Sequence, residues 1–357
     1  MNLKSGTKSP RLLSFMRKLA TIWSMWFKWI APAVLFFLVA AQSRPVAQET
    51  NIPTISVSVN LVKVPFSVFD QRGSLVSELR REDFRIWEDR SPQQIRSFGL
   101  DTNPVSVVLL LDTSMSGKAE LKQIKAAADE FAEALSREDR ISVVAFDDEV
   151  YRALDWTADV KKVRRALGKL SSGVRTALYD AMNYAATEQL KGIEGRKAII
   201  LLTDCVNNQS NVSFHEAELS IVQSQASFYV VSKTDIVKEQ AKRERRVIMI
   251  SDILKRMFGG DEDYIDEFFK KREGEMSDLS EKTGGRCFFL KDYRDLTDIY
   301  TQVARELKSK YYLTYVSNQA LLPDSYHGIS IEYLEPASKV VYRKGYYYQP
   351  QRMRRIE

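Results

Sequence analysis

The sequence contains only two cysteines and two histidines among its 357 residues. These residues, Cys205, Cys287, His215 and His327, do not have the spacing of zinc ligands. The two cysteines allow one disulfide at most, and the sequence leaves open whether they pair or remain free, buried thiols. A zinc site built on these four side chains and a disulfide-rich scaffold are therefore both excluded.

Negative charge is missing from the first 41 residues, which contain six Lys or Arg and no Asp or Glu. The whole chain has a net charge of +6, so its remaining 47 basic and 47 acidic residues balance. A body without excess positive charge gives no support to phosphate-backbone binding. We expect no nucleic-acid partner.

Residues 1–41 have the pattern of a targeting segment. A basic stretch precedes the apolar run "WIAPAVLFFLVAA" (29–41), and Val39 and Ala41 fit the −3 and −1 positions of a cleavage site. This run suits a signal peptide, whereas an extension back to Ile22 reaches the length of an uncleaved membrane anchor. Both alternatives predict an exported protein that is periplasmic, secreted or membrane-tethered, with the membrane contacted only through this segment.

Five further changes of pattern follow along the chain. A polar linker at 42–54 leads into a small β module at 55–103, where apolar and polar residues alternate. From 104 to 316 strands alternate with helices, which indicates a doubly wound, Rossmann-like α/β domain. We expect a charged helical insertion at about 235–281 and a C-terminal β segment at 317–357. The two β segments should pack together, because an inserted domain returns its ends close to each other.

Oxygen-bearing side chains follow two of the predicted parallel strands. In "LLLDTSMSGK" (109–118), Asp112 ends a continuous apolar run, and hydroxyl side chains come directly after it. Asp204 ends "KAIILLTD", and Thr176 lies near the start of a predicted helix. With the common strand order 3-2-1-4-5-6, these ends meet where the order reverses. The residues expected to converge there are Asp112, Ser114, Ser116, Thr176 and Asp204.

This set offers only oxygen, which favours a hard cation: Mg²⁺, with Mn²⁺ or Ca²⁺ as alternatives. Two carboxylates and three neutral hydroxyls leave such an ion electrophilic and one ligand short. An Asp or Glu of a protein partner would complete it. We therefore expect recognition of an acidic protein partner.

The motif "DTSMS" resembles the DxSxS pattern of von Willebrand factor type A (VWA) domains. Thr176 in "GVRTALYDAM" and Asp204 in "IILLTD" match the distant Thr and Asp that complete the metal-ion-dependent adhesion site of that family. The resemblance implies a VWA domain that acts as an adhesion-type interaction module and not as an enzyme, with no catalytic residues. Mg²⁺ is the cation that the family's site implies.

The segments around this domain resemble the acidobacterial-type VWA-related family of exported bacterial proteins, over roughly residues 55–348. That family usually has glycine after the last metal Asp and after the "ED" of an N-terminal hairpin. This chain has Cys205 and Arg90 at those places. Glycine permits backbone angles that other residues adopt at a cost, so these two loops are where the chain departs from the pattern.

Several other interpretations stay open. The hydroxyl cluster after Asp112 could cap a helix, and a hydrolytic serine would need a base, for which neither histidine has a motif context. A metal-independent scaffold with a vestigial site and a metal-assisted hydrolase are the two functional rivals. We expect Asp147 and Asp148 in a solvated turn and Asp180 in a cap or salt bridge.

Overall fold

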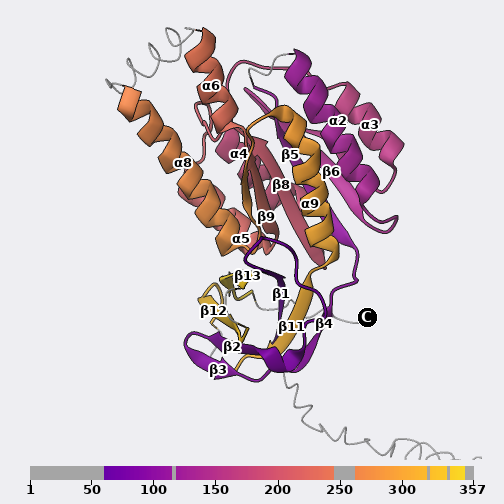
Figure 1. Ribbon diagram of the computed structural model, residues 1–357, viewed down its shortest axis with the longest axis vertical. Coiled ribbons are helices and arrows are strands. Elements are labelled where there is room, and N and C mark those ends of the chain that lie inside the picture. The colour runs from indigo at the N-terminus through magenta and orange to yellow at the C-terminus, as the bar shows by residue number, and fades with distance from the viewer. Residues whose placement is uncertain (1–59, 115–117, 245–261, 320–321, 336–337, 350–357) are drawn as a thin grey trace, which may run out of the picture. The chain divides into compact units, whose positions relative to one another are not determined.

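The computed structural model describes residues 60–114, 118–244, 262–319, 322–335 and 338–349 (Figure 1). All of them belong to one compact unit, Val59–Glu357. The predicted targeting segment, the linker and Ser116 lie outside the described residues, so export remains a prediction. Within the described ranges, none of the helices combines the length and the apolar character needed to cross a membrane.

A six-stranded sheet forms the centre of the α/β domain, in the order β10-β9-β8-β5-β6-β7. All neighbouring strands are parallel except β6 and β7. Every residue of β5 is buried, as its continuous apolar run predicts for a strand covered on both faces. The doubly wound prediction is confirmed, including the reversal of strand order between β5 and β8. The strands are β5 (Val105–Asp112), β6 (Arg140–Phe146), β7 (Val150–Thr157), β8 (Arg196–Thr203), β9 (Ser227–Ser232) and β10 (Cys287–Phe289).

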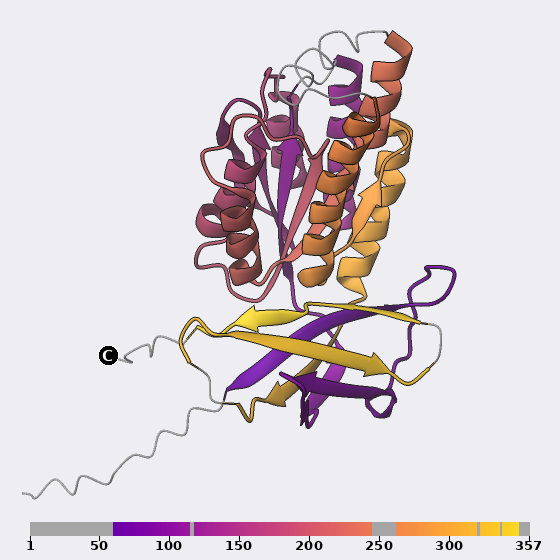
Figure 2. The same cartoon turned by 90° about the vertical axis from the view of Figure 1, so that its left-hand side faces the viewer.

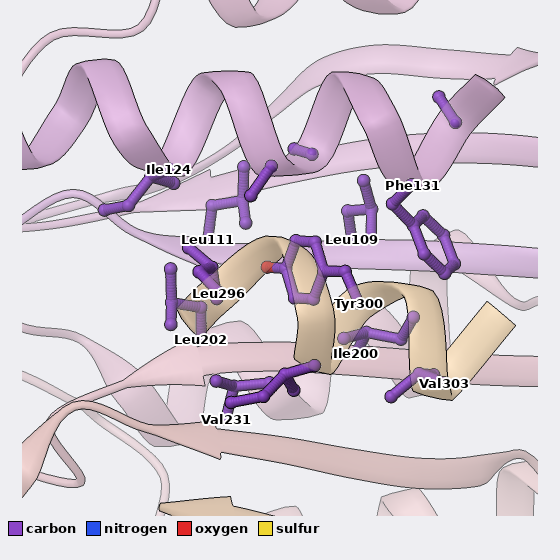
Figure 3. Packing of buried hydrophobic residues seen from close by; sticks show 14 of the residues in the cluster. Leu109, Leu111, Ile124, Phe131, Ile200, Leu202, Val231, Leu296, Tyr300 and Val303 are labelled. Atoms are coloured by element: carbon purple, nitrogen blue, oxygen red, sulfur yellow. The ribbon is translucent and has the colours of Figure 1, made fainter. Parts of the chain in front are cut away.

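Helices cover both faces of this sheet (Figures 1 and 2). Along β5, Leu109 and Leu111 point to one face and pack with Ile124 and Tyr300 (Figure 3). Leu110 points to the other face, as the two-residue period of a strand requires. The first face carries α2 (Lys118–Ala134), α3 (Val160–Gly168) and α9 (Leu296–Lys308), and the second carries α4 (Leu178–Tyr184), α5 (Phe214–Ser224) and α8 (Glu262–Lys282).

The segment predicted as a helical insertion is part of the crossover between β9 and β10. It contains α6 (Thr234–Glu244) and α8, while residues 245–261 lie outside the described ranges. Since β9 and β10 are parallel neighbours, the chain must return to the starting edge of the sheet between them. The charged helical segment is therefore the crossover connection of the α/β domain and not an insertion into it.

Strands from both ends of the chain form two four-stranded sheets, ordered β13-β1-β11-β4 and β14-β12-β2-β3. A single buried cluster, which includes Phe66, Ile86, Leu313 and Ile331, joins the two sheets. The prediction that the flanking β segments pack together is confirmed. Their strands are β1 (Leu61–Phe69), β2 (Phe84–Glu88), β3 (Ser91–Gln93), β4 (Ser97–Leu100), β11 (Tyr311–Val316), β12 (Tyr326–Tyr333), β13 (Lys339–Tyr342) and β14 (Gly345–Tyr347).

The position of β11 corrects the predicted end of the α/β domain at residue 316. β11 pairs with β1 and β4 and not with the six-stranded sheet. Tyr311 lies opposite Leu100, and the Asp101 amide donates to the Lys310 carbonyl at 2.8 Å. The α/β domain is thus inserted between two strands that pair with each other. An apolar strand after a helix looks the same in sequence whichever sheet it joins, so the pattern could not place it.

Asp89 and Arg90 form the two-residue turn between β2 and β3. Both have positive φ angles, 47° and 69°, the combination that a type I′ turn requires and that favours glycine at the second position. Arg90 is exposed. Arg90 therefore occupies a left-handed backbone position that favours glycine.

Arg90→Gly should raise the free energy of unfolding by about 0.5–1 kcal/mol, because it relieves the left-handed backbone of a non-glycine residue and loses no buried contact. Arg85→Gly is the matched control: Arg85 is exposed on the extended strand β2, where glycine should lower stability by a similar amount. Urea unfolding followed by circular dichroism measures both. A fall in stability for Arg90→Gly would contradict the assignment of this turn.

Candidate metal centre

The pairing of β5 with β8 brings the two predicted metal aspartates to one edge of the sheet. Leu111 lies opposite Leu202, so both strands end at the same level, with Asp112 closing β5 and Asp204 following β8. Asp112 is fully buried, whereas Asp204 is partly exposed. A site between them would thus be reached from solvent on the Asp204 side.

Three of the predicted ligands form a chain of hydrogen bonds. The Ser114 hydroxyl donates to Asp112 Oδ1 at 2.5 Å, and the Thr176 hydroxyl donates to Ser114 Oγ at 2.8 Å. All three side chains are at least 96% buried. Neighbouring oxygens around an octahedral Mg²⁺ lie about 3 Å apart. These oxygens therefore have the spacing and chemistry of ligands to a hard cation, and they fit the group that the sequence motif implies.

The loop that carries Thr176 is fixed by side chains from two other loops. Asn208 Oδ1 accepts from the Thr176 amide at 2.8 Å, and Asp148 Oδ1 accepts from the amides of Val174 and Arg175 at 3.0 and 2.5 Å. These two amides, Arg175 first, lower the pKa of Asp148. Of the two residues predicted in a solvated turn, Asp148 is exposed and Asp147 is only partly exposed. Asp148 also braces the Thr176 loop, which its sequence context did not indicate.

Gly173 brings the same loop against the turn after β6. It forms a parallel bridge with Ser114, and a Cβ atom at Gly173 would lie 2.5 Å from the Asp147 side chain. Only glycine fits that approach. Asp180 was predicted in a cap or salt bridge, but its carboxylate accepts from the amides of Asn211 and Val212, which precede the N-cap Ser213 of α5, so it fastens that loop and does not cap the helix.

Cys205 takes a left-handed backbone conformation, with φ of 63°, at a position where glycine would be favoured. Its amide donates to Thr203 Oγ1, and the next amide, of Val206, donates to Asp204 Oδ1, each at 3.0 Å. Cys205 and Cys287 are both free thiols. Burial raises the pKa of both, that of Cys287 to about 12, so both stay protonated at neutral pH.

A buried lysine that the sequence analysis missed completes the surroundings of Asp112. The Lys233 side chain is 3% exposed, and its Nζ lies 3.7 Å from Asp112 Oδ2. Burial alone would lower the pKa of this ammonium, but Asp112 and Asp204 reverse the effect and hold it above its usual value. Burial and the charge of Asp112 in turn raise the pKa of Asp204, and Lys233 offsets part of that rise. Because Lys233 follows an apolar strand, only the fold shows its partner.

The described residues contain no group of three or more His, Cys, Asp or Glu placed to hold a metal ion. The candidate centre is consistent with that finding, because only Asp112 and Asp204 among its predicted ligands are carboxylates. Its other described members, Ser114 and Thr176, are hydroxyls. The fifth predicted ligand, Ser116, lies outside the described residues.

The structure also joins Ser325, His327 and Asp89, which belong to the flanking β segments. Ser325 Oγ lies 2.7 Å from His327 Nε2, and His327 Nδ1 lies 2.7 Å from Asp89 Oδ2. However, Ser325 Oγ also lies 2.6 Å from the Leu322 carbonyl. The amides of Ser325 and Gly328 are already bonded, to Leu322 O and Asp89 Oδ1, so neither is free to stabilise an oxyanion. The trio ties the turn after β2 to β12.

In EDTA, Lys233→Met should lower the free energy of unfolding by about 3 kcal/mol, because Asp112 would lose its charged partner in a buried site. The double variant Asp112→Asn/Lys233→Met should recover most of that loss, since neither charge remains. Lys339→Met, which breaks an exposed pair with Glu281, should cost less than about 1 kcal/mol. Additive effects of the two site substitutions in denaturant unfolding would show that Lys233 and Asp112 do not form a pair.

Residues 107–207 match the family model described as the von Willebrand factor type A domain. This range contains all five predicted metal ligands, and it confirms the family resemblance of the "DTSMS" motif. No curated protein matches the chain.

Solved structures also match the chain, at low sequence identity. Proximal thread matrix protein 1 from the mussel byssus is 14% identical over 68% of this chain and 50% of its own, with a TM-score of 0.43. A von Willebrand factor type A protein from Catenulispora acidiphila is 10% identical over 82% of this chain and 74% of its own (TM-score 0.44). An aerotolerance-related membrane protein from Bacteroides fragilis is 18% identical over 57% and 98% (TM-score 0.41). The chain thus spans about half of the mussel protein.

Proposed function

Residues 107–207 of this chain are a von Willebrand factor type A domain, and we propose that it is an adhesion module that binds protein partners through a divalent cation. Domains of this family mediate protein–protein interaction. We further propose which cation this domain binds, which residues are its ligands and which partner residues it recognises.

The observation that carries this proposal is the hydrogen-bonded chain from Asp112 through Ser114 to Thr176. Ser114 Oγ lies 2.5 Å from Asp112 Oδ1 and 2.8 Å from Thr176 Oγ1, which comes from a segment 62 residues further along the chain, and all three residues are buried. A helix cap would explain Ser114 beside Asp112, but it gives no reason for Thr176 to join them. A cation bound by all three side chains would explain why they lie together.

We assign the cation to Asp112, Ser114, Ser116, Thr176 and Asp204, with Mg²⁺ as the physiological ion and Mn²⁺ or Ca²⁺ as substitutes. When bound, the ion supplies a positive charge that attracts an oxygen ligand. Ser114 and Thr176 are neutral and leave that charge largely unquenched. The residue best suited to complete the site is an Asp or Glu of the partner, which approaches from the side of the partly exposed Asp204.

The N-terminal pattern supports export, with the adhesion module outside the cytoplasm. The basic flank and apolar run of residues 1–41 would direct or tether the chain, and the balanced charge of the rest suits a protein partner better than a nucleic acid. The partner would therefore be an extracytoplasmic protein with an accessible acidic side chain.

One observation favours a second candidate, a metal-independent interaction scaffold. Lys233 already neutralises part of the negative charge at Asp112, so the fold does not need a metal ion to bury that carboxylate. In that case the partner would bind elsewhere on the chain, and binding would persist in EDTA.

Calorimetric titration with Mn²⁺ or Mg²⁺ distinguishes the two candidates. The full-length protein should bind one ion per chain, and Thr176→Ala should weaken binding by about tenfold or more, because it removes one of few ligands. Thr187→Ala, on an exposed helical threonine, is the matched control and should leave the affinity unchanged. Equal heats for Thr176→Ala and the unaltered protein would remove the metal site and favour the scaffold.

A further inference from the structure

We infer that Lys233 sets the charge balance of the candidate metal centre: it weakens cation binding by the empty site and strengthens the demand for an acidic ligand once the cation is bound. This inference rests on the proposed metal site and deepens it. Lys233 is a positioning and charge-setting residue and not a ligand.

The two oxygens of Asp112 have different neighbours. Oδ1 accepts from the Ser114 amide at 3.0 Å and from its hydroxyl, on the side where Thr176 also lies. Oδ2 accepts from the Thr203 hydroxyl at 3.2 Å and faces Lys233 Nζ at 3.7 Å. The lysine therefore does not occupy the side where the hydroxyl ligands gather, and a cation can bind Oδ1 while Lys233 remains on Oδ2.

The backbone around Lys233 is held on both sides of the residue. Its amide donates to the Thr203 carbonyl at 2.8 Å, and the Thr234 hydroxyl donates to the Asp204 carbonyl at 3.1 Å. These bonds fix the end of β9 against the loop that carries Asp204. Lys233 is 3% exposed, so it cannot turn to solvent when a cation arrives. Its charge is a permanent part of the site.

The net charge of the candidate metal centre changes sign when a divalent cation binds. Counted over Asp112, Asp204 and Lys233, the metal-free site has one excess negative charge when both carboxylates are ionised. Glu120, which is partly exposed, also acts on Lys233 and is outside this count. A divalent cation converts the excess negative charge into one excess positive charge in a buried position, where charge is poorly screened. A single carboxylate from a partner then makes the site neutral. Without Lys233, the loaded site would already be neutral and would attract a partner's acid less strongly.

Mn²⁺ binding to the full-length chain tests this inference, with acetate as the carboxylate probe. Lys233→Met and Lys233→Gln should bind Mn²⁺ roughly tenfold more tightly than the unaltered protein, because a nearby positive charge has been removed. Lys233→Arg, which keeps the charge, should bind as the unaltered protein does. Acetate should increase Mn²⁺ affinity more in the unaltered and Lys233→Arg proteins than in the two neutral variants.

Calorimetry supplies the affinities, and circular dichroism checks folding. If a neutral variant folds only with Mn²⁺, its Mn²⁺ affinity can be obtained from the Mn²⁺ concentration at its folding midpoint. Lys233→Gln keeps a hydrogen-bond donor for Asp112, whereas Lys233→Met does not. Neutral variants that bind Mn²⁺ equally or more weakly would overturn the inference, as would an equal acetate effect in all four proteins. If the unaltered protein binds no Mn²⁺ at all, it is the proposed metal site that fails.

Discussion

The parallel pairing of β5 with β8 is the constraint on which the candidate site depends. It brings Asp112 and Asp204 to the same edge of the sheet, at the point where the strand order reverses. Two carboxylates in a largely buried place repel each other and lose their hydration, so the surrounding chain must supply compensating groups. Hydroxyls, backbone amides and Lys233 supply them here.

This compensation divides the surroundings of Asp112 into two parts with different roles. One oxygen faces the hydroxyls of Ser114 and Thr176, which offer ligands without charge. The other faces Lys233, which offers charge without being a ligand. Lys233 thus compensates part of the Asp112 charge, while the oxygen atoms on the other side keep the spacing of cation ligands. Such a site is suited to bind a cation together with an acidic partner, more than to hold it permanently.

The sequence predicted what depends on local pattern and strand order. The apolar run into Asp112, the end of "KAIILLTD" at Asp204 and the helix near Thr176 were enough to predict both the α/β fold and the convergence of these residues. The sequence could not predict that Lys233 pairs with Asp112. A lysine after an apolar strand has no distinguishing pattern, and its partner becomes evident only when the neighbouring strand is known. The same limit misplaced β11, whose partners β1 and β4 are more than 200 residues away in the chain. At Cys205 and Arg90 the backbone has the positive φ that glycine would favour, so these two departures from the family pattern lie at left-handed positions.

Anomalous diffraction from crystals of the protein grown with Mn²⁺ tests the central claim most directly. We expect a single Mn²⁺ peak bound to Asp112 Oδ1, Ser114 Oγ and Thr176 Oγ1, with Lys233 still on Asp112 Oδ2. A crystal at saturating Mn²⁺ with no peak at this edge of the sheet, or with the ion on the Lys233 side of Asp112, would contradict it.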